Sequence, residues 1–172
     1  MSDAAQSPAT PFAECARVAL ARWPVQLARL EPLKVRENAV FAAYLHDGSR
    51  IIVRVHRLGY HSDEALESEH LWMSALAGAG ITVPRALHSR AGRAFEKIEI
   101  EGLPGARQVD VFEWIEGCQL GSVEQGLVAG APVASTYEAL GELAARIHSA
   151  ACAWSPPPDF RRHSWDAAGL VG

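Results

Sequence analysis

Two histidine patterns in the sequence have the chemistry of a metal-binding or reactive site. Glu67 and His70 stand three residues apart, the spacing at which a carboxylate and an imidazole on one helix face bind a metal together. A di-metal site needs such a pair on more than one helix, and the sequence has a single copy, so we reject this interpretation. His148 suggests a general base, because imidazole titrates near neutral pH.

The cysteines argue against a disulfide framework and against a zinc site. Cys15, Cys118 and Cys152 are odd in number, far apart and never in C-x-x-C spacing. Disulfide scaffolds and zinc sites use closer and more numerous thiols. We therefore expect a reduced, cytoplasmic protein with three incidental thiols.

The composition indicates a folded protein and excludes several classes. Of 172 residues, 49% are hydrophobic and 21% are charged, with a net charge of −4. A disordered chain is poorer in apolar residues. The mild acidity without a basic block argues against a nucleic-acid partner. No apolar run approaches the ~20 residues of a membrane span, and residues 1–10 lack the features of a secretory signal. The length allows one domain, or one and a fraction.

The first half of the chain predicts a helix, a β-hairpin and a second helix. We expect helices at 11–22 and 62–79, and strands at 25–33, 38–45 and 50–55. Pro32 places the first strand at a sheet edge, because proline cannot donate to a neighbouring strand. The Asp47-Gly48 step between apolar runs predicts the hairpin turn, and Ser62 is the expected N-cap of the second helix.

The second half predicts three short strands, a glycine-rich connection and a long helix. The strands are expected at 83–88, 94–100 and 109–114. A capping box from Ser135 to Glu138 opens the helix, whose apolar face carries Leu140, Leu143, Ala144 and Ile147. The fold class is therefore α+β: an antiparallel sheet with one main helix over the first ~115 residues, followed by helices.

Several stretches together resemble the aminoglycoside phosphotransferase and homoserine/choline kinase superfamily. They are E-N-A-V-F (37–41), I-I-V-R-V-H-R (51–57), S-E-H-L-W-M-S-A-L (68–76), G-I-T-V-P (80–84), V-F-E-W-I-E-G (111–117) and Y-E-A-L-G-E-L-A-A-R-I-H (137–148). The tail F-R-R-H-S-W-D-A-A-G-L-V-G (160–172) is similar to the branch of the bacterial stress-response Ser/Thr kinase. The resemblance implies a protein-kinase-like fold: a disordered tail at 1–10, a nucleotide-binding lobe at 11–116, and the hinge exit with an incomplete helical lobe at 117–172.

The resemblance implies a cation on the third strand that binds the phosphates of ATP, oriented by an acid on the next helix. The cation is Arg54, because Val53 and Val55 on either side of it would point to the opposite face. The acid is Glu69, with Glu67 as the second choice. An arginine there would hold phosphate as a bidentate fork.

The resemblance places further nucleotide contacts in a turn and in a hinge. The turn at 36–38 contains Asn38 but no glycine, so a plain β-turn and a phosphate contact are equally open there. The hinge at 111–117 contains Glu113 and Trp114, where backbone groups would pair with adenine; at least one of its aromatic side chains is expected to be core. His148 falls in a structural helix of the large lobe, which favours a packing role over a general base.

The catalytic parts of the superfamily are missing from this sequence. Catalysis there uses a loop His-x-Asp-x-x-x-x-Asn and a second metal-binding Asp. The only H-x-D is His61-Ser62-Asp63, which precedes the helix and is followed five residues later by Ser68. We therefore expect no catalytic residue and no Mg²⁺ ligand in these 172 residues, which correspond to the N-terminal part of a longer enzyme.

Two functional hypotheses follow. The first is the N-terminal part of an ATP- and Mg²⁺-dependent phosphotransferase acting on a hydroxyl of a small molecule or of a protein Ser/Thr. The second is a non-catalytic nucleotide-binding or interaction module, such as a truncated pseudokinase. In the second hypothesis the apolar face of the last helix would be covered by another chain or by a dimer mate.

Overall fold

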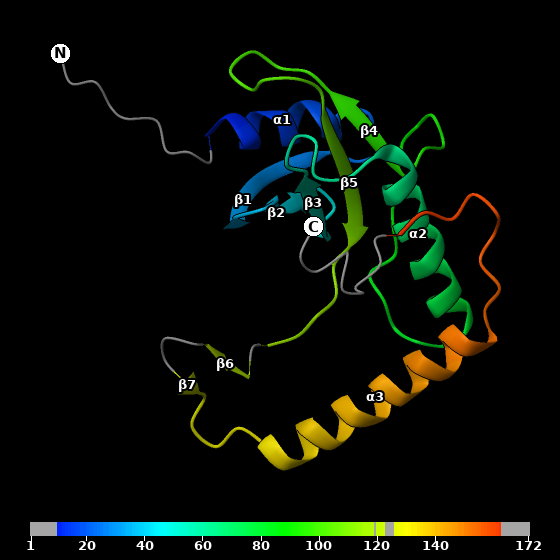
Figure 1. Ribbon diagram of the computed structural model, residues 1–172. Coiled ribbons are helices and arrows are strands. Elements are labelled where there is room, and N and C mark those ends of the chain that lie inside the picture. The colour runs from blue at the N-terminus through cyan, green and yellow to red at the C-terminus, as the bar shows by residue number, and fades with distance from the viewer. Residues whose placement is uncertain (1–9, 119, 123–125, 163–172) are drawn as a thin grey trace.

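The computed structural model describes residues 10–118, 120–122 and 126–162, and it contains a five-stranded sheet and three helices (Figure 1). The helices are α1 (Thr10–Leu20), α2 (Asp63–Gly78) and α3 (Val133–Ala153). The main strands are β1 (Leu27–Val35), β2 (Ala39–Leu45), β3 (Arg50–Val55), β4 (Phe95–Ile98) and β5 (Arg107–Glu113). A small hairpin of β6 (Gly121–Ser122) and β7 (Gly126–Leu127) precedes α3. The tail expected over residues 1–10 lies outside the described residues, apart from Thr10, which begins α1.

The sheet is antiparallel throughout, with strand order β1-β2-β3-β5-β4. The predicted turn joins β2 to β3: Gly48 has φ of 85°, and the Asp47 carboxylate accepts from the Ser49 N–H at 2.9 Å. Pro32 lies in β1, at the sheet edge as predicted, beside an irregularity in the register with β2. The predicted α+β fold class is confirmed.

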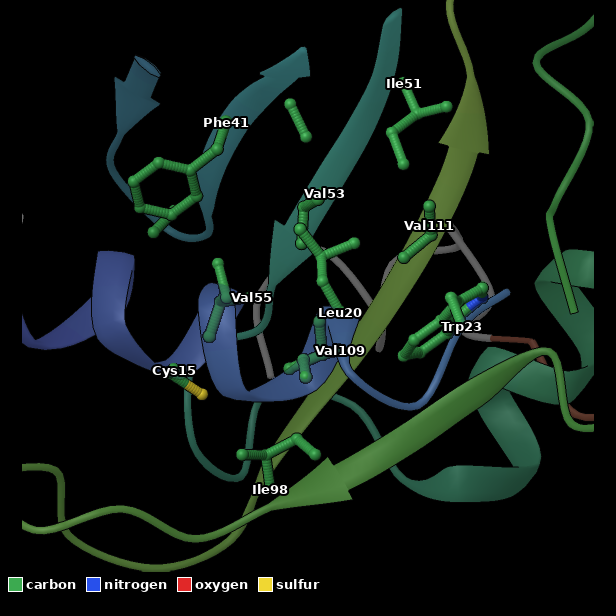
Figure 2. Packing of buried hydrophobic residues seen from close by; sticks show 14 residues of the cluster. Cys15, Leu20, Trp23, Phe41, Ile51, Val53, Val55, Ile98, Val109 and Val111 are labelled. Carbon is green, nitrogen blue, oxygen red and sulfur yellow. The ribbon is translucent and has the colours of Figure 1, made fainter. Parts of the chain in front are cut away.

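One face of the sheet packs against α1 and contains the hydrophobic core (Figure 2). Cys15 and Leu20 of α1, together with Trp23, meet valines and isoleucines of β3, β4 and β5. Trp23 is fully buried, and its indole N–H donates to the carbonyl oxygen of Leu87 at 2.7 Å. This packing covers β3 and β5, which pair side by side.

The opposite face of the sheet carries polar side chains and faces α2. Successive residues of a strand point to opposite faces, so Val53 and Val55 in the core turn Arg54 toward α2. The helix itself begins as predicted: the Ser62 hydroxyl accepts from the Ala65 N–H at 3.2 Å. Acidic residues fill its first turn, where they suit the helix dipole.

The strand predicted at 83–88 is wrong. Ala86 alone forms a β-bridge, with Phe112, and the segment is held to β5 by two backbone hydrogen bonds, Leu87 N to Val111 O (2.8 Å) and Glu113 N to Arg85 O (2.9 Å). Pro84 lacks an N–H, and β4 already pairs with the first half of β5. The segment therefore borders β5 for only three residues.

The capping box predicted at Ser135 is also wrong. α3 begins three residues earlier, with Pro132 at the N-cap position and no side-chain cap. The hydroxyls of Ser135 and Thr136 both donate back to the Pro132 carbonyl oxygen, at 3.2 and 2.8 Å. The Thr136 N–H also donates to the Pro132 carbonyl oxygen at 3.0 Å, so the first backbone hydrogen bond of the helix begins upstream of the predicted signal.

α3 extends away from the sheet and, among the described helices and strands, contacts only the end of α2 (Figure 1). Arg146 donates to the Gly80 carbonyl oxygen at 2.7 Å, and Trp154, just after α3, packs on Trp72 at 4.9 Å between ring centres. No residue of α3 is buried, and Tyr137 and Leu140 are 63% and 56% exposed. The apolar face of this helix is therefore open to solvent.

Candidate functional site

The candidate site lies between the polar face of the sheet and α2, and Arg54 is at its centre. β3 carries Arg54 in the middle of the sheet, where strands β2 and β5 flank it on both sides. The side chain is 20% exposed, so it is mostly buried but still reaches solvent. A cation in this position can meet a ligand that enters between the sheet and the helix.

The structure brings the two residues predicted as the cation and its acid together. Arg54 Nη2 donates to Glu69 Oε1 of α2 at 2.8 Å. The second choice, Glu67, is exposed on α2 and makes no ion pair within the described part of the chain. The geometry therefore selects Glu69 as the partner of Arg54, while the role of the pair in phosphate binding stays a prediction.

A second carboxylate, Asp110 of β5, also binds Arg54 and was not predicted. Arg54 Nε donates to Asp110 Oδ1 at 3.0 Å, and Nη2 donates to Oδ2 at 2.6 Å. Arg54 and Asp110 are directly opposite each other in the register of β3 and β5. The Asp110 side chain has no exposed surface, which makes this pair a buried one.

Two histidines complete the surroundings of Asp110. His56 Nε2 lies 3.1 Å from Asp110 Oδ2, and His70 Nε2 of α2 lies 3.4 Å from the same oxygen. Both histidines are buried, and the His70 ring stacks on Phe112 with ring centres 5.5 Å apart. Arg54 lies over the same Phe112 ring at 5.0 Å. Side chains of the sheet and of α2 therefore surround Asp110 together, and we call this group the Asp110 cluster.

The electrostatics of the cluster keep its three central groups ionised. Burial raises the pKa of Asp110, but His56, His70 and Arg54 facing its oxygens outweigh burial and lower it. Burial likewise raises the pKa of Glu69, and the charge of Arg54 outweighs that effect. Burial lowers the pKa of Arg54, whereas the bonds and charges of Asp110 and Glu69 raise it on balance. One cation therefore meets two anions.

The segment after α3 supplies a second cation to this site. It returns along α2 (Figure 1), where the Arg161 N–H donates to the Ser68 hydroxyl at 2.7 Å. Arg162 Nη1 then reaches Glu69 Oε2 at 3.2 Å. Because this arginine is 42% exposed, its contact with Glu69 is at the solvent edge of the site. The two arginines and two carboxylates balance in formal charge.

The predicted turn residue Asn38 ties the end of β1 to the end of β3. Its side-chain oxygen accepts from the Arg57 N–H at 3.2 Å, and its carbonyl oxygen accepts from the Arg36 N–H at 3.1 Å. These bonds shape the turn, and the amide oxygen is already engaged. A phosphate contact by Asn38 stays a prediction.

The hinge residues Glu113 and Trp114 lie where β5 ends. The Glu113 N–H is bound to Arg85, and the Trp114 ring packs under the Arg50 guanidinium at 4.4 Å. Residues 114–116 then leave the sheet without a backbone hydrogen bond to any described residue. Free backbone groups of this kind are what an adenine edge requires, and the contact with adenine stays a prediction. His148, on α3, is exposed.

The described residues do not form a divalent metal site. No group of three or more His, Cys, Asp or Glu side chains among them is arranged to hold a metal ion. The carboxylates of Glu69 and Asp110 are already bound by arginine. A metal that accompanies a nucleotide would therefore need ligands outside this cluster.

The sequence contains a signal for Asp110, although no motif includes this residue. Asp110 stands between Val109 and Val111, so a carboxylate interrupts an apolar strand. A buried charge is tolerated only when it is paired, and the antiparallel neighbour of that strand carries Arg54. Alternation also places His56 on the same face as Arg54. Nothing in the sequence pointed to Arg162.

A five-stranded antiparallel sheet whose central cation pairs with an acid of the following helix defines the small lobe of a kinase-like fold. The comparison with family models agrees: the phosphotransferase enzyme family matches residues 29–171. The chain therefore belongs to this family of phosphotransferases.

Solved structures place the fold among kinases. A microcompartment-associated aminopropanol kinase is 29% identical with a TM-score of 0.71; the match covers 88% of this chain and 44% of that one. The amicoumacin kinase hAmiN, in complex with AMP-PNP, Ca²⁺ and Ami, is 21% identical with a TM-score of 0.71, covering 92% and 45%. The present chain thus spans less than half of the length of either kinase.

Two further comparisons gave negative results. No curated protein matches the chain at a significant level. Among the described helices, none combines the length and the apolar character that crossing a membrane requires.

Proposed function

We propose that this chain is the nucleotide-binding part of an ATP-dependent phosphotransferase. The observation that carries the proposal is the 2.8 Å ion pair between Arg54 of β3 and Glu69 of α2. Phosphoryl transfer spreads negative charge over the transferred group, so catalysis depends on cations held in place against the phosphates. A cation that is 20% exposed and anchored by two carboxylates meets that need.

The proposed ligand is ATP accompanied by Mg²⁺. One structural neighbour is described in complex with AMP-PNP and Ca²⁺, which supports a nucleotide and a divalent ion as a class. The phosphates would meet Arg54, and the adenine edge would pair with the backbone at 114–116, which no described residue engages. The Mg²⁺ would be held by residues outside the described cluster.

The proposed acceptor is a hydroxyl of a small molecule or of a protein Ser/Thr. The chain spans 44–45% of its kinase neighbours, and its described residues contain no metal-binding group, so we expect nucleotide binding without phosphoryl transfer by the chain alone. We place the protein in the cytoplasm, because its cysteines are free thiols, two of them exposed.

Calorimetric titration with ATP and Mg²⁺ tests the proposal. Arg54→Gln keeps a hydrogen-bond donor near Asp110 but removes the cation, and we expect it to weaken binding about tenfold or more. Arg93→Gln is the matched control, because Arg93 also binds a buried carboxylate, Glu96 of β4, and makes no bond to Arg54, Asp110 or Glu69. Equal affinity in wild type and Arg54→Gln would remove Arg54 from the phosphate site, and no binding by wild type would refute the proposal.

The exposed face of α3 favours a second candidate, a non-catalytic module that another chain covers. Tyr137 and Leu140 are 63% and 56% exposed on a helix with no buried residue. Apolar patches of this kind are typical of interfaces. Light scattering tests it: a dimer that Leu140→Glu separates would support a self-association role, and a stable monomer would argue against one.

A further inference from the structure

Asp110 is the only fully buried carboxylate of the described residues on the α2 side of the sheet, and the proposed nucleotide site uses it only as a second anchor for Arg54. Glu69 alone would be enough to orient a cation on β3. Asp110 nevertheless has 0% side-chain exposure and binds Arg54 through two hydrogen bonds. Burying a carboxylate is costly unless its partners are well placed. A specific task for this carboxylate would explain its place in the sheet.

The contacts of Arg54 show what Asp110 does to the guanidinium. Nε and Nη2 bind the two oxygens of Asp110, and Nη2 also binds Glu69. A planar guanidinium held at both Nε and Nη2 cannot rotate about its long axis. Nη1 makes no hydrogen bond to any described residue, so the free donor group points in one fixed direction.

Asp110 also has neighbours other than Arg54 that hold its carboxylate in place. His56 Nε2 at 3.1 Å and His70 Nε2 at 3.4 Å both face its Oδ2 atom. His70 is in turn stacked on Phe112 of the same strand. The carboxylate thus has the support from neighbouring side chains that a residue needs in order to hold another in place.

We propose that Asp110 is a positioning residue that orients Arg54 toward a bound phosphate, and that it makes arginine rather than lysine the cation required at this strand position. A lysine ammonium has one nitrogen at the end of a flexible stem, so it cannot hold both carboxylates and also present a free donor in a fixed direction. Arginine does both at once. The inference rests on the proposed function for the phosphate contact, whereas the orientation of Arg54 by Asp110 is independent of it.

The orientation is tested first, without any nucleotide, by NMR of the arginine Nε–H groups in the full chain. The Arg54 signal is assigned by its loss in Arg54→Lys. We expect it to exchange slowly with water in wild type and in Glu96→Gln, a control that alters the other buried carboxylate, and rapidly in Asp110→Asn. A slowly exchanging signal in Asp110→Asn would overturn the proposal.

Phosphate binding is tested next, with tripolyphosphate and with ATP and Mg²⁺ as probes. We expect Asp110→Asn and Arg54→Lys each to weaken binding about tenfold or more, and the double variant to bind no more weakly than Asp110→Asn alone. Glu96→Gln should bind as wild type does. Wild-type affinity in Arg54→Lys would overturn the requirement for arginine. If Asp110→Asn fails to fold, Arg54→Lys still tests the proposal, because its lysine keeps the buried carboxylate of Asp110 paired with a cation.

The two proposals fail in different ways. If wild type binds neither probe, the proposed nucleotide function is refuted, and the NMR exchange rates alone decide whether Asp110 orients Arg54. If wild type binds both probes and Asp110→Asn binds them equally well, the nucleotide function stands and the positioning role is refuted.

Discussion

Among the described residues, each face of the sheet contains one buried carboxylate, and the two carboxylates have different surroundings. Asp110 of β5 faces α2 and binds Arg54, whose side chain is only 20% exposed. Glu96 of β4 lies on the α1 side and binds Arg22 and Arg93, which are 50% and 60% exposed. Both carboxylates pair with arginine, but only Asp110 pairs with one that is itself largely buried.

The difference shows that similar pairs of a carboxylate with arginine can have different roles in the fold. Arg22 follows α1 and Arg93 belongs to the turn before β4, so Glu96 joins two peripheral segments to the sheet. Asp110 joins the centre of the sheet to α2 through Arg54 and Glu69. The first arrangement is explained by folding alone, whereas the second holds a cation, 20% exposed, between the sheet and α2.

The largest expected effect comes from removing the buried arginine. Arg54→Met leaves Asp110 buried with only its histidines, and breaking a buried pair in this way costs about 3–5 kcal/mol in the free energy of unfolding. Arg93→Met should cost about 1 kcal/mol or less, because Arg93 is mostly exposed and Arg22 still binds Glu96. Urea denaturation measures both. Equal losses of unfolding free energy in the two variants would mean that Asp110 and Glu96 depend on their arginines to the same extent.

The second effect comes from neutralising the other carboxylate. Glu96→Gln keeps an acceptor oxygen for Arg22 and Arg93 but loses the charge, so we expect a loss of about 1–2 kcal/mol in unfolding free energy. Affinity for ATP should be unchanged, because Glu96 lies on the α1 side. Thermal unfolding with and without the nucleotide measures both quantities, and a weaker nucleotide affinity would contradict the separation of the two faces.

The third effect is a difference in acid sensitivity. Burial raises the pKa of Glu96, but hydrogen bonds from Arg93, Ser89 and Arg22 outweigh it and lower the pKa to about 2. The pKa of Asp110 is lowered as well. A lowered pKa in the folded state stabilises the protein above the unfolded value, and that stability is lost as the pH falls toward the folded value.

We therefore expect the unfolding free energy to fall below about pH 4, by up to about 1.4 kcal/mol per pH unit for each carboxyl. Denaturation of Glu96→Gln and Asp110→Asn between pH 5 and about pH 2 measures the slopes. Each variant should lose stability less steeply than wild type. If Asp110→Asn lost stability with the same slope as wild type, the Asp110 carboxyl would have the same pKa in the folded and the unfolded protein.

The smallest effect is expected at the solvent edge of the Asp110 cluster. Arg162→Ala removes an exposed pair with Glu69, and exposed pairs contribute about 0.2–1 kcal/mol. The loss should disappear in high salt, which screens exposed charges more than buried ones. Denaturation at low and high ionic strength measures it. A loss that persists in salt would place Arg162 among the buried members of the cluster.

Much of the fold could be predicted from local patterns. The Asp47-Gly48 turn, the Ser62 cap and the edge strand with Pro32 appear as predicted, because each depends on backbone preferences of a few neighbouring residues. The segment at 83–88 and the start of α3 were wrong for a related reason. Whether Ala86 meets a strand, or Pro132 begins a helix, depends on what lies beside them in space.

The site was predicted in part. Alternation along β3 turned Arg54 away from the core, and the resemblance to kinases paired it with Glu69. Asp110 and Arg162 are 56 and 93 residues distant from their partners in the chain. No local spacing connects such residues, and only the register of β3 with β5 and the return of the chain along α2 bring them together.

The sequence by itself determined which residues face the core, where the hairpin turns and that Arg54 interrupts the apolar run of β3, because these follow from side-chain alternation and turn chemistry. The tertiary structure decided what that arginine binds. Strand order placed Asp110 opposite Arg54, and the packing of α2 added Glu69 and His70. A buried charge takes its partners from whichever elements pack around it, so its environment is a property of the assembled fold.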